Sequence, residues 1–231
     1  MKTRSPFIAC AFAGVMLAGT NLPAQESTPP FSVTEREQVY SAAITKRATA
    51  AVELLAIADA AKSNKVHEVI VKQYRALRAR DEAIDTMFKA LSQDAPGAET
   101  NRSEVLRVLS RQLHQQFLTT LGGELDPAQV DQVKDKMTYN KLKVTYDAYG
   151  AILPNLNASE KAQIMDLLKA AREEAMDGGS ADEKSAIFQK YKDQINAALG
   201  AHGHDVAKAT REWESKQAAA APTEAAPKPA N

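Results

Sequence analysis

The chain has 231 residues, of which 44% are hydrophobic and 25% charged, and its 29 basic side chains balance 29 acidic ones. The zero net charge argues against a dedicated nucleic-acid binder. A mean hydropathy of -0.37, with a single apolar run too short to span a bilayer, argues against a polytopic membrane protein. A single cysteine excludes an intramolecular disulfide framework and a cysteine-rich zinc site. These figures predict a globular protein made of one domain.

The first 24 residues are typical of a secretory signal peptide. Lys2 and Arg4 precede an apolar run over residues 7–18, and Ala24 is followed by polar residues. The alternative is an uncleaved anchor helix, which the run disfavours because a membrane span needs about 20 apolar residues. Cys10 comes before most of the run, so we expect no lipidation. We therefore expect export to the periplasm or beyond, from a bacterium, with no stable membrane insertion after cleavage.

Both ends of the exported chain are poor in core-forming residues. Residues 25–33 contain two consecutive prolines, and residues 218–231 consist almost wholly of Ala, Pro, Thr and Glu. Neither segment has enough apolar surface to offset the entropy lost on ordering the backbone. The sequence predicts a flexible segment over 25–33, a helical domain over 34–217 and a disordered tail over 218–231.

Two amphipathic helices are predicted at the start of the domain, over residues 34–55 and 60–91. Thr34 and Glu37 have the spacing of a capping box at the start of the first. Four apolar residues of that helix are expected on its buried face: Val39, Ala43, Val52 and Leu55. The second helix has apolar residues at steps of three and four, with charges between them. We interpret its run 78–82, and a similar run at 172–174, as solvated helix faces with local ion pairs.

The rest of the domain also has helical periodicity. A loop over 92–102 is followed by a predicted helix over 103–121, ended by two glycines. Asp126, Asn157 and Ser180 each stand three residues before Gln or Glu, which is the pattern of a capped helix start. A last helix is expected from Asp205 to residue 217. No segment shows sustained alternation, so the sequence predicts an all-α bundle of about seven helices.

A tyrosine-rich stretch between residues 137 and 154 is the least helical part of this pattern, and we expect an irregular connection there. Flat aromatic faces stack on sugar rings, while amides and carboxylates hydrogen-bond the hydroxyl groups. Five residues are therefore candidates for carbohydrate binding: Tyr139, Asn140, Tyr146, Asp147 and Tyr149. The alternative is that Tyr146 and Tyr149 pack into the core with their hydroxyls at its edge.

Signals for metal binding and for catalysis are weak. His202, His204 and Asp205 offer three possible ligands after a helix end, but a polar turn with Asp205 capping the last helix is the simpler interpretation. Nucleophile elbows, phosphate-binding glycine loops and paired zinc histidines are not found. We predict no metal, no cofactor and no catalytic residue.

Several segments resemble one known family. Residues 74–77, 125–139, 144–146, 171–180 and 188–192 are similar, in this order, to a bacterial family of exported proteins of unknown function that is labelled as sugar-binding. The resemblance extends over about residues 40–213. It implies a carbohydrate ligand and assigns no role to any residue.

Two functions remain open. The first is an exported, non-catalytic helical protein that binds a carbohydrate, as the family resemblance and the tyrosine-rich stretch indicate. The second is a helical interaction protein of the cell envelope, chaperone-like or stress-sensing. Its long amphipathic helices, and helix starts similar to those of small periplasmic chaperones, favour this alternative, whose protein partner the sequence does not identify.

Overall fold

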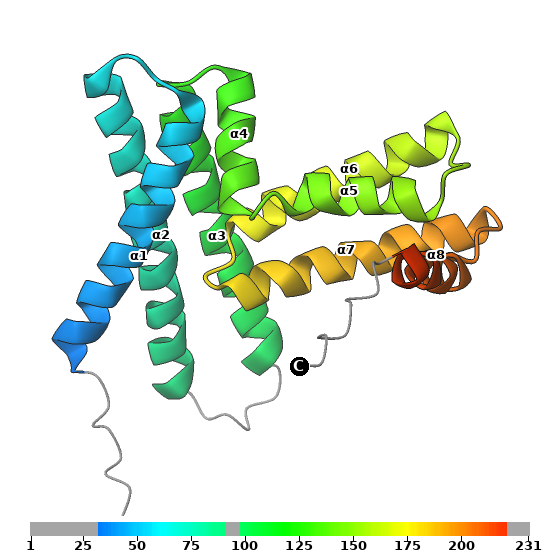
Figure 1. Ribbon diagram of the computed structural model, residues 1–231. Coiled ribbons are helices and arrows are strands. Elements are labelled where there is room, and N and C mark those ends of the chain that lie inside the picture. The colour runs from blue at the N-terminus through cyan, green and yellow to red at the C-terminus, as the bar shows by residue number, and fades with distance from the viewer. Residues whose placement is uncertain (1–31, 91–97, 221–231) are drawn as a thin grey trace, which may run out of the picture.

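The computed structural model describes residues 32–90 and 98–220, and they form eight helices and no strand. The predicted all-α class is confirmed. The helices are α1 (Val33–Leu55), α2 (Ala60–Ala90), α3 (Ala98–Gly122), α4 (Pro127–Met137), α5 (Lys141–Ile152), α6 (Ala158–Met176), α7 (Ala181–Ala201) and α8 (Val206–Ala220) (Figure 1). The predicted signal peptide and most of the predicted segment 25–33 and tail 218–231 lie outside the described residues, but Val33 and residues 218–220 are helical and extend the predicted helical domain at both ends. None of the described helices is long and apolar enough to cross a membrane.

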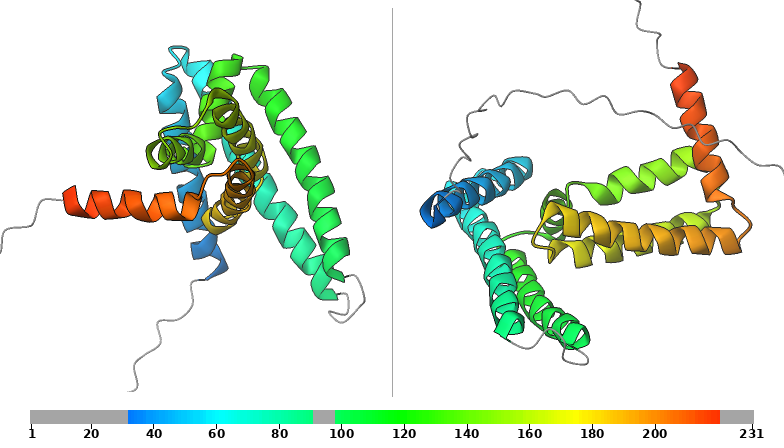
Figure 2. Two further views of the ribbon diagram at one scale, coloured as in Figure 1. Left: turned by 90° about the vertical axis from the view of Figure 1, so that its right-hand side faces the viewer. Right: turned by 90° about the horizontal axis from the view of Figure 1, so that it is seen from below.

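The helices form two groups that meet at a steep angle. Helices α1 to α4 stand side by side, and α5, α6 and α7 extend away from them (Figure 1). Helix α8 crosses the far end of the second group, where it packs on α5 and α7 (Figure 2). The C-terminal end of α6 reaches back to α4, so α6 joins the two groups.

Three of the predicted helix starts are confirmed with their full hydrogen bonding. The side chains of Asp126, Asn157 and Ser180 each accept a hydrogen bond from the backbone three residues later, and the Gln or Glu at that position bonds back. Pro127 occupies the first turn of α4, where its missing N–H costs no hydrogen bond. These caps depend only on neighbours within one turn, which is why the sequence shows them.

Two helix starts differ from the predictions. Helix α1 is capped by Ser32 with Glu35, two residues before the predicted pair of Thr34 and Glu37. Helix α3 begins at Ala98, inside the segment predicted as a loop. Its first turns pack against the end of α2, and Arg102 pairs with Asp85 there, so contact with a neighbouring helix extends α3 beyond its own apolar pattern.

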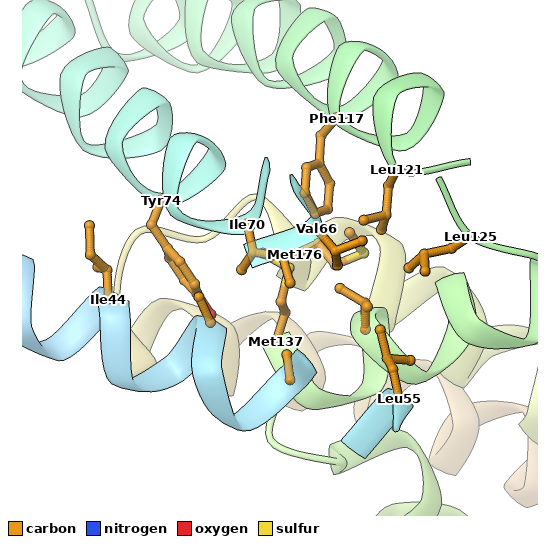
Figure 3. Close-up of a cluster of buried hydrophobic side chains, with 13 residues drawn as sticks. Ile44, Leu55, Val66, Ile70, Tyr74, Phe117, Leu121, Leu125, Met137 and Met176 are labelled. Atoms are coloured by element: carbon orange, nitrogen blue, oxygen red, sulfur yellow. The ribbon is translucent and has the colours of Figure 1, made fainter. Parts of the chain in front are cut away.

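The first core lies among α1 to α4 (Figure 3). It consists of the following buried residues: Ile44, Ala48, Ala51, Leu55, Val66, Ile70, Tyr74, Phe117, Leu121, Leu125, Val133, Met137 and Met176. The predicted buried face of α1 is therefore correct at Leu55 and wrong at Val39, which is 62% exposed. The true face steps from Ile44 through two alanines, whose small side chains let α1 approach its neighbours closely.

The second core lies among α5 to α8. It consists of Tyr149, Leu153, Leu156, Ile164, Leu168, Ala171, Ala175, Phe188, Ile195 and Leu199. Ala175 belongs to this core and the next residue, Met176, to the first. Consecutive helical residues point about 100° apart, so the end of α6 can supply side chains to both cores.

The tyrosine-rich stretch is helical, so the predicted irregular connection is wrong over most of its length. Within residues 137–154, only 138–140 and 153–154 lie outside the helices, and both Tyr139 and Asn140 are left-handed, with φ of 58° and 54°. Helix α5 follows at once, because residues spaced by four and three, from Leu142 through Tyr149, pack on the second core.

Candidate functional site

A cleft lies where the two groups of helices meet, between α3 and the pair of α6 and α7. Its volume is about 740 Å³. Ten of its lining residues can carry a charge: Arg80, Asp81, Arg107, Arg111, His114, Glu173, Glu174, Asp177, Glu183 and Lys190. Leu106, Ala186 and Ile187 add apolar surface. A volume of a few hundred cubic ångströms with convergent polar groups is typical of a small-ligand site.

His114 is held between two carboxylates of α6 and the turn that follows it. Its Nδ1 lies 3.2 Å from Asp177 Oδ1, and its Nε2 lies 3.3 Å from Glu173 Oε2. The hydrogen bond to Asp177, followed by that to Glu173, raises the pKa of His114 to about 9. The imidazole is therefore protonated at neutral pH, and it clamps α3 to α6.

Glu173 lies within ion-pair distance of three cations, of which His114 and Lys134 are the nearest and Arg172 is 3.6 Å away. Lys134 of α4 donates to both of its oxygens at 3.0 Å. Burial raises the pKa of Glu173, but the hydrogen bonds from His114 and Lys134 outweigh it and bring the pKa down to about 2. Glu173 is thus an anion that links α3, α4 and α6.

Arg80 of α2 is a buried residue of the cleft lining. It is 7% exposed, and its guanidinium bonds Asp81 beside it, Ser110 Oγ on α3 at 2.9 Å and the carbonyl of Asp177 at 2.9 Å. Burial raises the pKa of Asp81. Gly179 leaves room for the Asp81 carboxylate, which would have to shift if residue 179 carried a Cβ.

Arg172 braces α6 against α4 beneath the cleft. It is 6% exposed, and it donates to Asp131 Oδ1 at 2.7 Å and to Asp135 Oδ1 at 2.8 Å. The interpretation of residues 78–82 and 172–174 as solvated faces is therefore wrong at Arg80 and Arg172. Both arginines occupy positions of the apolar stripe. Arg80 bonds Asp81 on its own helix, Ser110 on α3 and the carbonyl of Asp177, while Arg172 bonds two carboxylates of α4 and keeps its buried Nε without a partner.

The five candidate residues of the tyrosine-rich stretch line neither this cleft nor the second cavity described below. Tyr149 is 5% exposed, and its hydroxyl donates to Asn196 Oδ1 at 2.7 Å. Tyr146 packs against the second core, and Asp147 pairs with Lys143 on the surface. Tyr139 and Asn140 are exposed at the break between α4 and α5. Carbohydrate binding by these five residues stays a prediction, and the structure does not gather them around one cavity.

His202 and His204 converge on one carboxylate. His204 Nε2 lies 2.9 Å from Glu160 Oε1, and His202 Nδ1 lies 3.5 Å from the same oxygen. Asp205 accepts from the backbone N–H of Lys208, as a cap of α8 does. This corner borders a second, more open cavity of about 660 Å³. Over residues 32–90 and 98–220, no three His, Cys, Asp or Glu side chains are placed to hold a metal ion.

One protein family, described as "Protein of unknown function (DUF3826)", has a model that matches residues 41–219. The chain belongs to this family. The match covers the cleft and both cores, so the whole arrangement described above lies within the family domain. None of the curated proteins compared with the chain matches it. Membership of a family of unknown function is thereby confirmed, while carbohydrate binding and export stay predictions.

None of the residues that line the cleft is among the site residues predicted from the sequence. A signal existed for Arg80, which follows Leu77 by three residues and precedes Ile84 by four, and so stands on the buried stripe of α2. A charge on such a stripe needs a partner from another helix. His114 had no comparable signal, since its two carboxylates are supplied by residues about 60 positions away.

The clamp at His114 predicts a distinct dependence of stability on pH. A folded pKa of about 9 against 6.5 unfolded means that its contribution is complete below pH 6.5 and is lost as the pH rises through 9. Such a shift corresponds to at most roughly 3 kcal/mol, and we expect about 2 kcal/mol because the side chain is part-exposed. Urea unfolding of the protein and of a His114→Gln variant between pH 6 and 10 measures this contribution as a difference.

The unfolding free energies of the unmodified protein and of His114→Gln have to be subtracted, because Lys184 titrates in the same pH range. Burial lowers the pKa of Lys184 to about 8, so its own effect is a gain of stability as the pH rises from 8 towards 10.5. Lys184 is present in both proteins and cancels. A difference that stays constant from pH 6 to 10 would contradict the clamp.

Proposed function

We propose that the protein is an exported, non-catalytic binding protein that takes a carbohydrate in the cleft between α3 and the α6–α7 pair. The observation that carries the proposal is the cleft itself, with charged, planar hydrogen-bonding groups on its walls and apolar surface from Leu106 and Ile187 between them. A sugar ring likewise combines polar and apolar surface, because its hydroxyls lie around the edge and its C–H groups form an apolar face.

The rigidity of the cleft supports binding. Arg80, His114 and Glu173 are each held by at least two partners within the protein. Side chains fixed in this way lose little further entropy when a ligand binds. The resemblance to exported proteins labelled as sugar-binding, and the signal-like residues 1–24, support the ligand class and the location.

The same contacts favour binding over catalysis. A general base must offer a free lone pair to the proton that it takes. Both nitrogens of His114 are engaged with carboxylates, and its raised pKa keeps it protonated. We therefore assign the imidazole a positioning role.

A blocking substitution tests the proposal. Ala186 lines the cleft and is exposed, so Ala186→Trp should fill the cleft without disturbing either core. We expect calorimetric titration with neutral and acidic mono- and trisaccharides to detect binding to the unmodified protein, and Ala186→Trp to weaken it at least about tenfold, or 1.4 kcal/mol. Ala197→Trp is the matched control, because Ala197 is exposed on the same helix and lines neither cavity.

A negative titration would favour the alternative function. Met87, near the end of α2, and Val108 and Leu109, near the middle of α3, are large apolar side chains that are exposed. Such surfaces can dock a protein partner. If no saccharide binds and the protein suppresses aggregation of an unfolded client at stoichiometric amounts, the helical interaction function replaces carbohydrate binding.

A further inference from the structure

The acidic and basic side chains of the cleft differ in how many hydrogen-bonding partners they have within the protein. Among its acidic residues, Asp81 is bonded by Arg80, Glu174 by Lys190 at 2.8 Å, and Asp177 by His114. Glu183 accepts from the backbone N–H groups of two residues before α7. Glu173 has His114 and Lys134. Every carboxylate that lines the cleft therefore already has a donor within the protein.

Two cations on α3 differ from this pattern. Arg107 and Arg111 stand four residues apart, so they lie one above the other on the same face of the helix, and both are exposed. Arg111 makes no ion pair with any described residue. Arg107 bonds only Glu104, one turn earlier on its own helix, with Nε 2.9 Å from Oε2. Most of the hydrogen-bond donors that a ligand could still use in the cleft therefore belong to the guanidinium groups of these two arginines.

From this imbalance we infer that the ligand is an acidic saccharide, with its carboxylate bound by Arg111 and Arg107. A guanidinium presents two parallel N–H groups that match the two oxygens of a carboxylate, and it cannot give up its charge. The apolar side chain of Leu106 lies in the same wall, next to Arg107, where it can take the ring face. The carboxylates on the opposite wall then accept from the sugar hydroxyls through their remaining lone pairs.

This inference rests on the proposed function, and it adds a ligand class to it. It requires that binding fall with ionic strength, because the guanidinium groups are exposed and screened by salt. It also requires that a neutral sugar of the same ring structure bind more weakly.

Matched pairs of sugars test it. Calorimetric titration compares galacturonate with galactose and glucuronate with glucose, each as a monosaccharide and a trisaccharide where available, at low and high salt. We expect the acidic member of at least one pair to bind about tenfold or more tightly, and Arg111→Leu to abolish this preference. Arg36→Leu is the control, since Arg36 is exposed on α1, far from the cleft lining, and has no ion pair with a described residue.

The possible outcomes distinguish a failure of the inference from a failure of the proposed carbohydrate binding. If acidic and neutral sugars bind equally well, or if Arg111→Leu leaves the preference intact, the inference is overturned while carbohydrate binding stands. If no sugar of either kind binds, the proposed function itself fails. Circular dichroism melts of Arg111→Leu exclude misfolding, which we do not expect for an exposed side chain.

Discussion

Replacing Tyr149 with Ala is expected to lower the free energy of unfolding by about 3 kcal/mol or more. The ring lies in the second core with 5% of its surface exposed, and the hydroxyl is bonded to Asn196 and to the carbonyl of Lys192 on α7. Burial also raises the pKa of Tyr149 to about 12. Truncation would leave a cavity between α5 and α7, together with an unpaired amide at Asn196.

Two further variants resolve this effect into its parts. Tyr149→Phe keeps the ring and should cost only about 1 kcal/mol, the usual value of one hydrogen bond. Tyr139→Ala is the matched control, because that ring is 43% exposed, and it should change the stability by less than about 0.5 kcal/mol. Urea unfolding measures all three. Equal losses for Tyr139→Ala and Tyr149→Ala would show that Tyr149 is not part of a core.

The second large effect is expected at Arg172. Removing its side chain in Arg172→Ala should cost about 3 kcal/mol, because the guanidinium is buried and bonds Asp131 and Asp135 on another helix. The two carboxylates are partly exposed, so water can rehydrate them, which places the loss at the lower end of the range for broken buried pairs. The contact between α4 and α6 would loosen beneath the cleft, and we expect ligand binding to weaken with it.

Arg75→Ala is the matched control for this prediction. Arg75 pairs with Glu37 between α1 and α2, but more than half of its side chain is exposed and the closest approach is 3.7 Å. Exposed pairs contribute less than about 1 kcal/mol. Arg172→Met, which keeps much of the buried length, should give an intermediate loss. Thermal or urea unfolding in which Arg75→Ala costs as much as Arg172→Ala would rule out a special role for burial.

The contrast between Tyr149 and the other candidate residues shows why the site could not be predicted from the stretch 139–149. Crowding of tyrosines in sequence suggests a common surface, but consecutive helical residues point in different directions. Once this stretch is helical, Tyr149 faces the core, Asp147 faces solvent, and Tyr139 stands at the break before α5. Their spacing along the chain therefore does not place them around one ligand.

The cleft shows the opposite case, in which distant residues come together. Arg80 bonds a carbonyl 97 positions away, and His114 bonds a carboxylate 63 positions away. Each of these residues sits in an ordinary amphipathic pattern on its own helix. Only the way in which the two groups of helices meet, with side chains reaching across between α2, α3 and the end of α6, makes them neighbours.

The sequence by itself determined the all-α class and the starts of α4, α6 and α7, because capping and helical periodicity act between residues within one or two turns. It also predicted membership of a family of unknown function. Only the tertiary structure decided that Arg80 and Arg172 are buried, that His114 is a protonated clamp, and that a cleft separates α3 from α6 and α7. The reason is physical: most of the partners that make burial of these charges tolerable come from residues distant in the sequence, and no local pattern records them.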